Sequence, residues 1–207
     1  MKRLVDIIIA SIALLLLSPI FILVAYKVKK NLGSPIFFYQ NRPGRNCNQF
    51  KMIKFRSMRD AFDSDGHPLP DDQRITPFGK KLRSTSLDEM PQLINVLKGD
   101  MSIVGPRPQL PEFVEHYTSH QLRRHEVKPG MTGLAQVSGR NSLSWEDKFN
   151  LDVQYVDRQS IIFDFKIMFK TVEVMLKKEG IDSPDQAVGA TRFSGTNPTS
   201  DTKSTRH

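Results

Sequence analysis

The feature that most constrains this chain is the apolar run from Leu4 to Tyr26. About 20 apolar residues cross the hydrocarbon core of a bilayer, so the run is long enough to span one. Its centre, however, contains Ser18-Pro19. Proline removes a backbone donor and collides with a carbonyl one turn earlier, which kinks a helix. The neighbouring serine can donate a hydrogen bond to the freed carbonyl, so such a kink is tolerated in lipid.

The charges that flank the run leave more than one arrangement open. Basic residues stand at both ends: Lys2, Arg3, Lys27, Lys29 and Lys30. Because basic residues mark the cytoplasmic side, this pattern favours a re-entrant helix-break-helix over a kinked spanning helix. A cleaved signal peptide fits the basic start, but no small-x-small cleavage site follows. Asp6 would be costly in the hydrocarbon core, so we expect it near the membrane interface.

The composition indicates one domain of ordinary size in addition to this anchor. The 207 residues carry a formal charge of +8, which favours anionic partners, and 25% of them are charged. The single cysteine, Cys47, excludes an internal disulfide and fits a reducing compartment. We predict a membrane anchor over 1–30, a globular domain over 31–182 and a poorly ordered tail over 183–207, in which Arg192-Phe193 could dock.

The globular part is predicted to be α+β and mostly helical. Residues 37–39 and 50–55 are typical of short strands, 57–77 of a surface loop and 128–133 of a turn. Helices are expected at 93–97, 111–125, 144–157 and 161–178. The last helix is apolar on one side and lysine-rich elsewhere. Core packing is the ordinary explanation of such a helix, and a position in the membrane interface is the alternative.

The stretch STSLDEMPQL (84–93) contains two adjacent carboxylates, Asp88 and Glu89. Ser86 and Glu89 have the spacing of a capping box, and Pro91 is tolerated only early in a helix. The positive end of a helix dipole would keep these carboxylates ionised, as a nucleophile or a ligand of a hard metal ion. Acidic residues are also common in first turns without any catalytic role.

Two further segments contain arginines in rigid or glycine-rich surroundings. In Gly105-Pro106-Arg107-Pro108, prolines fix the backbone on both sides of the arginine, which suits bidentate phosphate binding. The segment PGMTGLAQVSGR (129–140) has glycines that permit close backbone approach, and it ends in Arg140. For each segment alone, the commoner explanation is an ordinary one: a rigid loop with an exposed arginine, or a glycine-rich turn.

Five segments follow the basic anchor in a fixed order: FKMIKFRSM, SLDEMPQL, KGDMSIVGPRP, PGMTGLAQVSGR and SWEDKFNLDVQYV. In this combination the chain resembles the bacterial sugar transferase family, the small monotopic polyprenol-phosphate phosphoglycosyl transferases. The resemblance extends from Lys2 to about Phe193. Among these enzymes the chain is similar to those that start glycan assembly with a bacillosamine-type phosphosugar.

The resemblance implies an Asp-Glu dyad, which falls on Asp88 and Glu89, together with Mg²⁺. It also implies a UDP-sugar donor, with UDP-N,N'-diacetylbacillosamine or a similar N-acetylated sugar as one candidate, and undecaprenyl phosphate as acceptor. Asp88 would attack the donor, expel UMP and pass the phosphosugar to the lipid in a ping-pong reaction. Glu89 would help to hold the metal or handle a proton. By position in the motifs, four residues are predicted to contact phosphates: Lys54, Arg83, Arg107 and Arg140. Asp164 is a further candidate for binding or supporting the metal.

The resemblance also implies a place in the cell, the cytoplasmic face of the bacterial inner membrane. The basic charge would lie against anionic phospholipid, and the product would supply downstream glycosyltransferases. The alternative from another class is a non-catalytic, membrane-anchored basic binding module, which needs neither the dyad nor a metal. Nucleic acid is not an expected partner, because aromatic residues are not interleaved with basic ones beyond FKMIKF.

Overall fold

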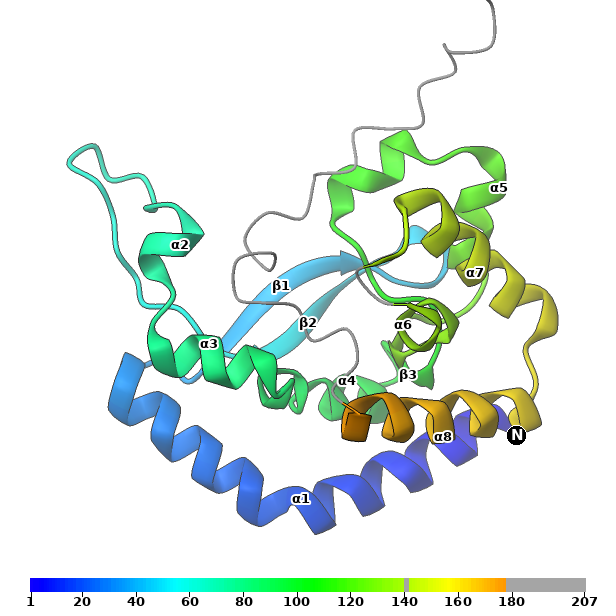
Figure 1. Cartoon of the computed structure of the whole chain (residues 1–207), viewed down its shortest axis with the longest axis horizontal. Helices are drawn as coiled ribbons and strands as arrows, with labels where there is room; N and C mark the ends of the chain where they lie inside the picture. The colour runs from blue at the N-terminus through cyan, green and yellow to red at the C-terminus, as the bar shows by residue number, and fades with distance from the viewer. Residues whose placement is uncertain (140–141, 178–207) are drawn as a thin grey trace, which may run out of the picture.

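The structure, a computed structural model, describes residues 1–139 and 142–177. The predicted tail over 183–207 and Arg140 lie outside these residues. The described part is α+β and mostly helical, which confirms the predicted class. One long helix, α1 (Lys2–Leu32), lies beneath a body of shorter helices and two small sheets (Figure 1).

Helix α1 contains Pro19 in its interior and continues past residue 30, the predicted end of the anchor. Ser18 Oγ donates a 2.8 Å hydrogen bond to the Leu15 carbonyl, which lies one turn before the proline. This confirms the predicted role of the serine beside the proline. The ribbon bends near its middle, as expected for a proline inside a helix (Figure 1). The predicted break is therefore a bend in a continuous helix.

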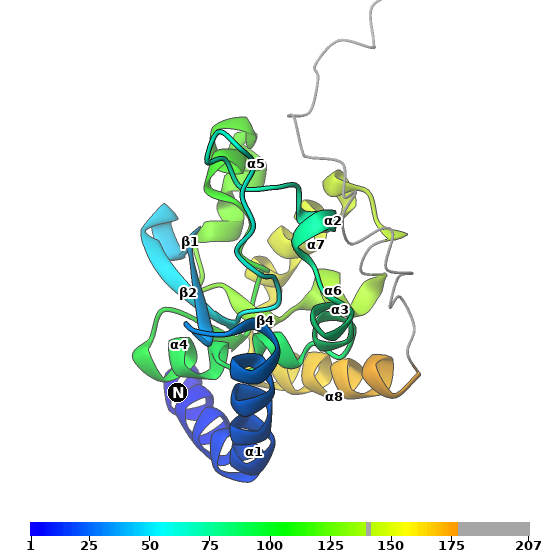
Figure 2. The same ribbon diagram turned by 90° about the vertical axis from the view of Figure 1, so that its left-hand side faces the viewer.

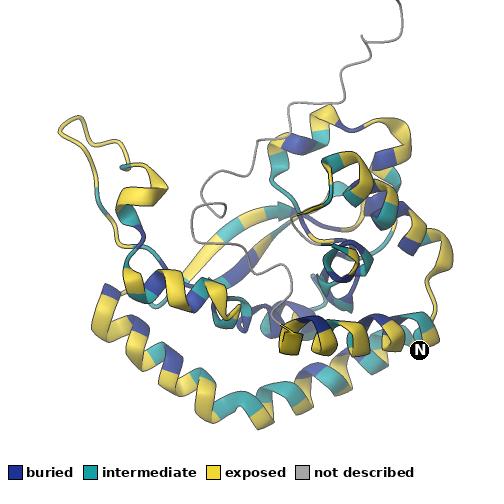
Figure 3. Cartoon of the chain, in the orientation of Figure 1, coloured by how far each residue is buried: buried dark blue, intermediate teal, exposed yellow. Residues whose placement is uncertain are grey.

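The buried residues of α1 lie towards its two ends, whereas the residues in its middle are at most half-buried. Near the start, Ala10 is fully buried in a cluster with Leu93 and Val96, and near the end Val24 and Val28 are buried. The apolar residues exposed along this helix are Leu4, Ile7, Ile8, Ile12, Leu15, Leu16, Ile20, Ile22 and Leu23 (Figure 3). Among the described helices, α1 alone is long and apolar enough to cross a membrane by length and composition.

Asp6 differs from the expectation that it lies at the membrane interface. Its carboxylate is buried inside the protein and accepts hydrogen bonds from Ser102 Oγ at 2.9 Å and from the Ile103 amide at 3.0 Å. These donors replace the water that a carboxylate would otherwise need. The sequence alone gave no indication that residues about a hundred positions away would supply them.

The predicted strands form an antiparallel hairpin of β1 (Phe37–Pro43) and β2 (Gln49–Phe55), in which Phe37 pairs with Phe55. The short turn η1 (Arg45–Cys47) connects them. Phe55 is 1% exposed, and its ring lies 4.8 Å from that of Phe21 on α1 and 5.5 Å from that of Phe37. The hairpin is thereby packed against the second half of α1.

The predicted loop over 57–77 contains the single-turn helix α2 (Asp71–Arg74) and leads into α3 (Pro77–Ser84). Thr76 caps α3, and its hydroxyl accepts from the Gly79 amide at 3.1 Å. The turn η2 (Leu87–Glu89) and helix α4 (Gln92–Lys98) follow. Gly99 closes α4 in the left-handed region at φ 94°, as the sequence predicts.

Two expectations for the next region were wrong. Residues 128–133 contain strand β4 (Gly130–Thr132), which pairs in parallel with β3 (Ser102–Val104), instead of only a turn. The helix expected over 111–125 is divided into η3 (Pro111–His116), α5 (Ser119–Leu122) and η4 (Arg123–His125). Thr118 interrupts it by forming a capping box with Gln121, which starts a new helix.

The chain continues through α6 (Leu134–Ser138), α7 (Trp145–Arg158) and α8 (Ile161–Lys177). Ser144 caps α7 by accepting from the Asp147 amide at 3.0 Å, as predicted. Ile167 of α8 is buried with Val104 and Tyr155, so one side of α8 packs on the core. Figure 2 shows α8 and α1 on the same side of the body.

The hairpin core gives a test of this packing. Replacing Phe55 by Ala should lower the free energy of unfolding by about 3–5 kcal/mol, because the substitution empties a closed aromatic cluster. Phe38→Ala is the matched control, since Phe38 is in the same hairpin but 47% exposed, and should cost less than about 1 kcal/mol. Denaturant unfolding in detergent measures both, and equal losses would contradict the packing described.

Candidate active site

The predicted dyad lies in η2, the short turn between α3 and α4. The expected capping box is not formed. Ser86 adopts the left-handed conformation at φ 55° and its side chain makes no capping hydrogen bond. The Glu89 side chain points to basic residues instead of back to Ser86. Asp88 and Glu89 therefore precede α4, and their environment is set by neighbouring side chains.

Glu89 is held by two cations that come from distant segments. Lys54 Nζ of β2 lies 2.8 Å from Oε1, and Arg107 Nη2 lies 2.5 Å from the same oxygen. Arg107 Nη1 donates to Oε2 at 3.2 Å, which makes the arginine contact bidentate. Burial alone would raise the pKa of Glu89, but Arg107 and Lys54 together lower it well below its usual range. Glu89 is therefore a fixed anion at any physiological pH.

Asp88 has a different environment, although it is adjacent in sequence. Its side chain is buried, and within 1–139 and 142–177 it has no hydrogen bond or ion pair. Burial and the charge of Glu89 raise the pKa of Asp88 to about 6, against the opposing effect of Lys54, Arg83 and Arg107. The dyad thus consists of one carboxylate held by cations and one that is unpaired and titrates near neutral pH.

The structure brings Lys54, Arg83 and Arg107 together with the dyad, as the sequence predicts for phosphate-binding residues. Lys54 and Arg107 contact Glu89 directly. Arg83, on α3, donates to Ser57 Oγ at 2.9 Å and acts on Asp88 through its charge. Three positive charges therefore surround two carboxylates, which leaves an excess positive charge suited to a phosphate group.

The backbone around Arg107 is fixed by close contact between two glycine-rich segments. A Cβ atom on Gly105 would lie 2.4 Å from the Lys128 carbonyl oxygen, and one on Gly130 would lie 2.1 Å from the Gly105 nitrogen. Only glycine permits this approach, which confirms the predicted role of Gly130. Pro106 and Pro108 restrict the chain further on both sides of Arg107.

Several residues that support the site were not found from sequence. Arg124 is fully buried, donates to the Arg107 carbonyl at 2.7 Å and forms an ion pair with Asp152 at 2.6 Å. Asn95 is also fully buried, accepts from the Ile53 amide at 3.0 Å and so fixes the strand that carries Lys54. Asn95 lies in an apolar stretch and Arg124 among other polar residues, but the partners of both are far away in the chain, so no local pattern identifies them.

Two predicted residues are not part of the assembled site. Asp164 is buried, forms an ion pair with Lys2 at 2.5 Å and accepts from the Tyr155 hydroxyl at 2.7 Å. These contacts are to α1 and α7 and not to the dyad. Asp164 therefore forms a structural ion pair and is not placed to bind or support a metal ion at the dyad. Arg140 lies outside the described residues.

The unpaired Asp88 oxygens fit a hard cation such as Mg²⁺, which prefers carboxylate ligands. Glu89 could share such an ion through the lone pairs that Lys54 and Arg107 leave free. A second group of potential metal ligands lies in the exposed loop before α2 and consists of Asp63, Asp65 and His67. Asp63 already accepts from the backbone amides of Asp65 and His67, which explains that arrangement without an ion.

Comparisons with known proteins identify the family of this chain. The family described as bacterial sugar transferase matches residues 1–178. The uncharacterized sugar transferase EpsL of Bacillus subtilis (strain 168) is 50% identical over 94% of this chain and 96% of its own length. The undecaprenyl-phosphate galactose phosphotransferase of Salmonella typhimurium is 39% identical over 87% of the chain. The UDP-glucose:undecaprenyl-phosphate glucose-1-phosphate transferase of Klebsiella pneumoniae is 44% identical over 83% of it.

The chain therefore belongs to the bacterial sugar transferase family. It is an enzyme of the phosphoglycosyl transferase class, which confirms the predicted family and excludes the alternative of a non-catalytic binding module. The chain covers 41% of the length of the Salmonella relative and 39% of that of the Klebsiella relative, so these two proteins contain more than the part shared here.

The charge on Asp88 yields a prediction about stability. Because the pKa of Asp88 is about 6 in the folded protein and near 3.9 in an unfolded chain, ionisation of Asp88 opposes folding as pH rises. Asp88→Asn should therefore raise the free energy of unfolding at pH 8, by up to about 3 kcal/mol. The gain should decline as pH falls from 6 to 4, because the carboxyl of the unfolded wild-type chain also becomes protonated as the pH approaches about 3.9.

Denaturant unfolding of both proteins between pH 4 and pH 8 measures this difference. Asp60→Asn is the control, because Asp60 has an exposed carboxylate outside the site, and it should show no comparable gain. A destabilised Asp88→Asn protein at pH 8 would contradict the account of the dyad.

Proposed function

We propose that this protein transfers a phosphosugar from a UDP-sugar to undecaprenyl phosphate, which yields undecaprenyl-diphosphate-sugar and UMP. The observation that supports the proposal most is the unpaired Asp88 carboxylate beside a Glu89 carboxylate that two cations hold. A nucleophile needs a free, ionised oxygen, and cations around it are needed for the phosphates of donor and acceptor.

In the proposed first step, an Asp88 oxygen attacks the β-phosphorus of the donor. The new bond joins Asp88 Oδ to phosphorus, and the bond between that phosphorus and the bridging oxygen of the diphosphate breaks. UMP leaves with the bonding electrons, and Asp88 carries the phosphosugar as an acyl phosphate. In the second step, an oxygen of undecaprenyl phosphate attacks the same phosphorus and Asp88 is released as a carboxylate. Atoms and charge balance without a redox partner.

The basic residues have roles that follow from their positions. Arg107 and Lys54 contact Glu89 and are close enough to the dyad to bind the donor diphosphate. Arg83 adds positive charge near Asp88, and Arg140 is proposed as a further phosphate contact from its place in the motif. Because Glu89 keeps Lys54 and Arg107 in a fixed geometry, these donors need little rearrangement when charge develops on the phosphate.

Asp88 and Glu89 are also the residues proposed to hold Mg²⁺. Such an ion would neutralise charge on the phosphate oxygens of the donor. The fit rests on the unpaired oxygens of Asp88 and on the carboxylate of Glu89 beside it. Asp164 is not retained in this role, because it is committed to Lys2 and Tyr155.

The long helix supports a re-entrant, monotopic position in the membrane. Lys2 at its start contacts Asp164 of the body, and Leu32 at its end accepts a hydrogen bond from Arg56 of the same body. If both ends are fastened to one globular body, the exposed apolar middle can enter a membrane only if the helix bends and comes back to the face from which it entered. The body would then lie on the cytoplasmic face, against anionic phospholipid.

Helix α8 supports the same placement. Its exposed apolar residues are Ile162, Phe165, Phe169, Val172, Met175 and Leu176, and it lies on the same side of the body as α1 (Figure 2). An apolar face of this kind, with lysines beside it, suits the boundary between headgroups and acyl chains. The dyad would then work at the height of a lipid phosphate.

Two lines of argument give two kinds of donor. The resemblance to bacillosamine-type enzymes suggests an N-acetylated UDP-sugar, whereas the Salmonella and Klebsiella relatives are named for galactose and glucose. Radiolabel transfer into a lipid extract from UDP-N,N'-diacetylbacillosamine, UDP-galactose and UDP-glucose distinguishes these donors. The labelled lipid would be the first membrane-bound product of glycoconjugate assembly and a substrate for downstream glycosyltransferases.

The covalent step gives the sharpest prediction of mechanism. Given donor without lipid acceptor, the wild-type protein should release UMP in an amount comparable to the enzyme and gain the mass of one phosphosugar on a peptide that contains Asp88. Asp88→Asn should show neither event, although it should fold. Intact-protein and peptide mass spectrometry measure the adduct. The opposite outcome is full turnover when acceptor is present, but neither adduct nor released UMP when acceptor is absent. It would show that the lipid phosphate attacks the donor directly.

The membrane arrangement gives a separate prediction. In a Cys47→Ser background, a cysteine added before Met1 and Ser84→Cys, which lies on the exposed surface of α3, should be labelled from the same, cytoplasmic side. Inside-out and right-side-out vesicles treated with a membrane-impermeant maleimide measure this. Labelling of the added N-terminal cysteine only from the periplasmic side would contradict the re-entrant arrangement.

A further inference from the structure

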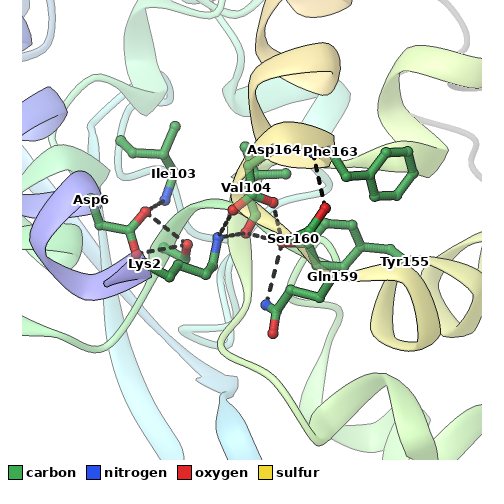
Figure 4. Close-up of polar contacts among 10 residues, drawn as sticks. Lys2, Asp6, Ile103, Val104, Tyr155, Gln159, Ser160, Phe163 and Asp164 are labelled. Atoms are coloured by element: carbon green, nitrogen blue, oxygen red, sulfur yellow. Dashed lines mark hydrogen bonds and ion pairs between the residues drawn. The ribbon is translucent and has the colours of Figure 1, made fainter.

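The start of α1 makes ionic contacts that membrane insertion alone does not require. Lys2 Nζ donates to the Val104 carbonyl at 3.1 Å and forms an ion pair with Asp164 at 2.5 Å (Figure 4). The Tyr155 hydroxyl lies 3.0 Å from the same Val104 carbonyl and 2.7 Å from Asp164. Three polar side chains from α1, α7 and α8 thus meet at the last residue of β3.

Asp6 lies one turn further along α1, on the same face as Lys2, and holds the rest of that strand. It accepts from Ser102 Oγ and from the Ile103 amide (Figure 4). The three residues of β3 are therefore each contacted by a charged side chain of α1, since Lys2 binds Val104. The second strand of that sheet, β4, holds β3 from the other side.

Strand β3 leads directly into the segment that carries Arg107. Gly105 is in contact with the backbone of Gly130, and the two prolines leave the segment little freedom. A displacement of β3 would therefore be passed on to Arg107 instead of being absorbed in a flexible loop. Arg107 in turn reaches Glu89 with a bidentate contact, whose geometry tolerates little movement.

We infer that Lys2 and Asp6 are positioning residues for Arg107. They hold β3 so that the guanidinium meets Glu89 at the dyad, which makes assembly of the site depend on the correct seating of the membrane helix. The inference rests on the proposed function only in taking Arg107 to bind the donor phosphates.

Arg3 adds a contact on the other side of the dyad. Its guanidinium donates to the Leu97 carbonyl at 2.7 Å and to the Val96 carbonyl, at the C-terminal end of α4. Helix α4 begins shortly after Glu89, so the first turns of α1 contact both the helix that follows the dyad and the strand that precedes Arg107. The start of the anchor thus holds the two segments between which Glu89 and Arg107 meet.

The ordinary explanation is that these contacts only fasten α1 to the body. The ion pair between Lys2 and Asp164 is only partly buried, and ion pairs contribute little to stability compared with apolar packing of the same volume, so stability alone is a weak reason for it. The two explanations differ in a measurable way. A fastening role predicts losses that are independent of Arg107, whereas a positioning role predicts that they depend on it.

The test is a double-mutant cycle on the full-length protein in lipid nanodiscs, read as kcat/KM for the UDP-sugar that supports transfer. Lys2→Met and Asp6→Ala should each lower kcat/KM about tenfold. In an Arg107→Lys background the same substitutions should cost less than about twofold. Asp6→Asn, which keeps an acceptor for the Ile103 amide, should retain activity within about threefold of the wild type.

Lys29→Met is the matched control, because it removes the same charge from an exposed position at the other end of α1, and it should leave kcat/KM nearly unchanged. Equal losses in the wild-type and Arg107→Lys backgrounds, or no loss in Lys2→Met, would overturn the inference. If Asp6→Ala does not fold, Lys2→Met decides alone. A wild-type protein that transfers no phosphosugar from any donor would overturn the proposed function, and the inference with it.

Discussion

The Glu89 carboxylate joins three separate segments of the chain, because Lys54 from the hairpin and Arg107 from the segment after β3 both bind it. Several features of the site depend on this contact. The contact keeps Glu89 ionised and fixes two cations where a diphosphate could bind. Burial is the largest cause of the raised pKa of Asp88, about 6, and the negative charge of Glu89 is the second. The two neighbouring carboxylates thereby acquire different properties: Glu89 is a fixed anion, and Asp88 is an unpaired carboxylate that we propose as the nucleophile.

The long helix contributes to this site as well as to the proposed membrane attachment. Val24 and Val28 pack in one core cluster with Phe55, and Ala10 packs in a second cluster with residues of α4. The hairpin, whose Lys54 contacts Glu89, and α4, which follows the dyad in the chain, therefore both rest on α1. A chain that is anchored in this way has little freedom to separate its membrane segment from its catalytic part, which suits an enzyme with one soluble and one lipid substrate.

The sequence predicted local features well, because neighbouring residues decide them. The strands of the hairpin, the Ser144 cap of α7 and the Gly99 end of α4 were all predicted from short patterns. The residues at the site were found because their spacing resembles a known family. The predicted capping box at Ser86 is not formed, because Lys54 and Arg107 bind the Glu89 carboxylate instead. Arg124, Asn95 and the partners of Asp6 depend on contacts between distant residues, which no local pattern reveals.

The most direct test of the central claim is the pH dependence of kcat/KM for the UDP-sugar donor. In a ping-pong reaction this constant reports the free enzyme and the first half-reaction, so it follows the ionisation of the attacking group. If Asp88 is the free nucleophile beside a fixed Glu89, kcat/KM should fall about tenfold per pH unit below an apparent pKa of about 6. A value that stays constant between about pH 5 and pH 8 would contradict this account.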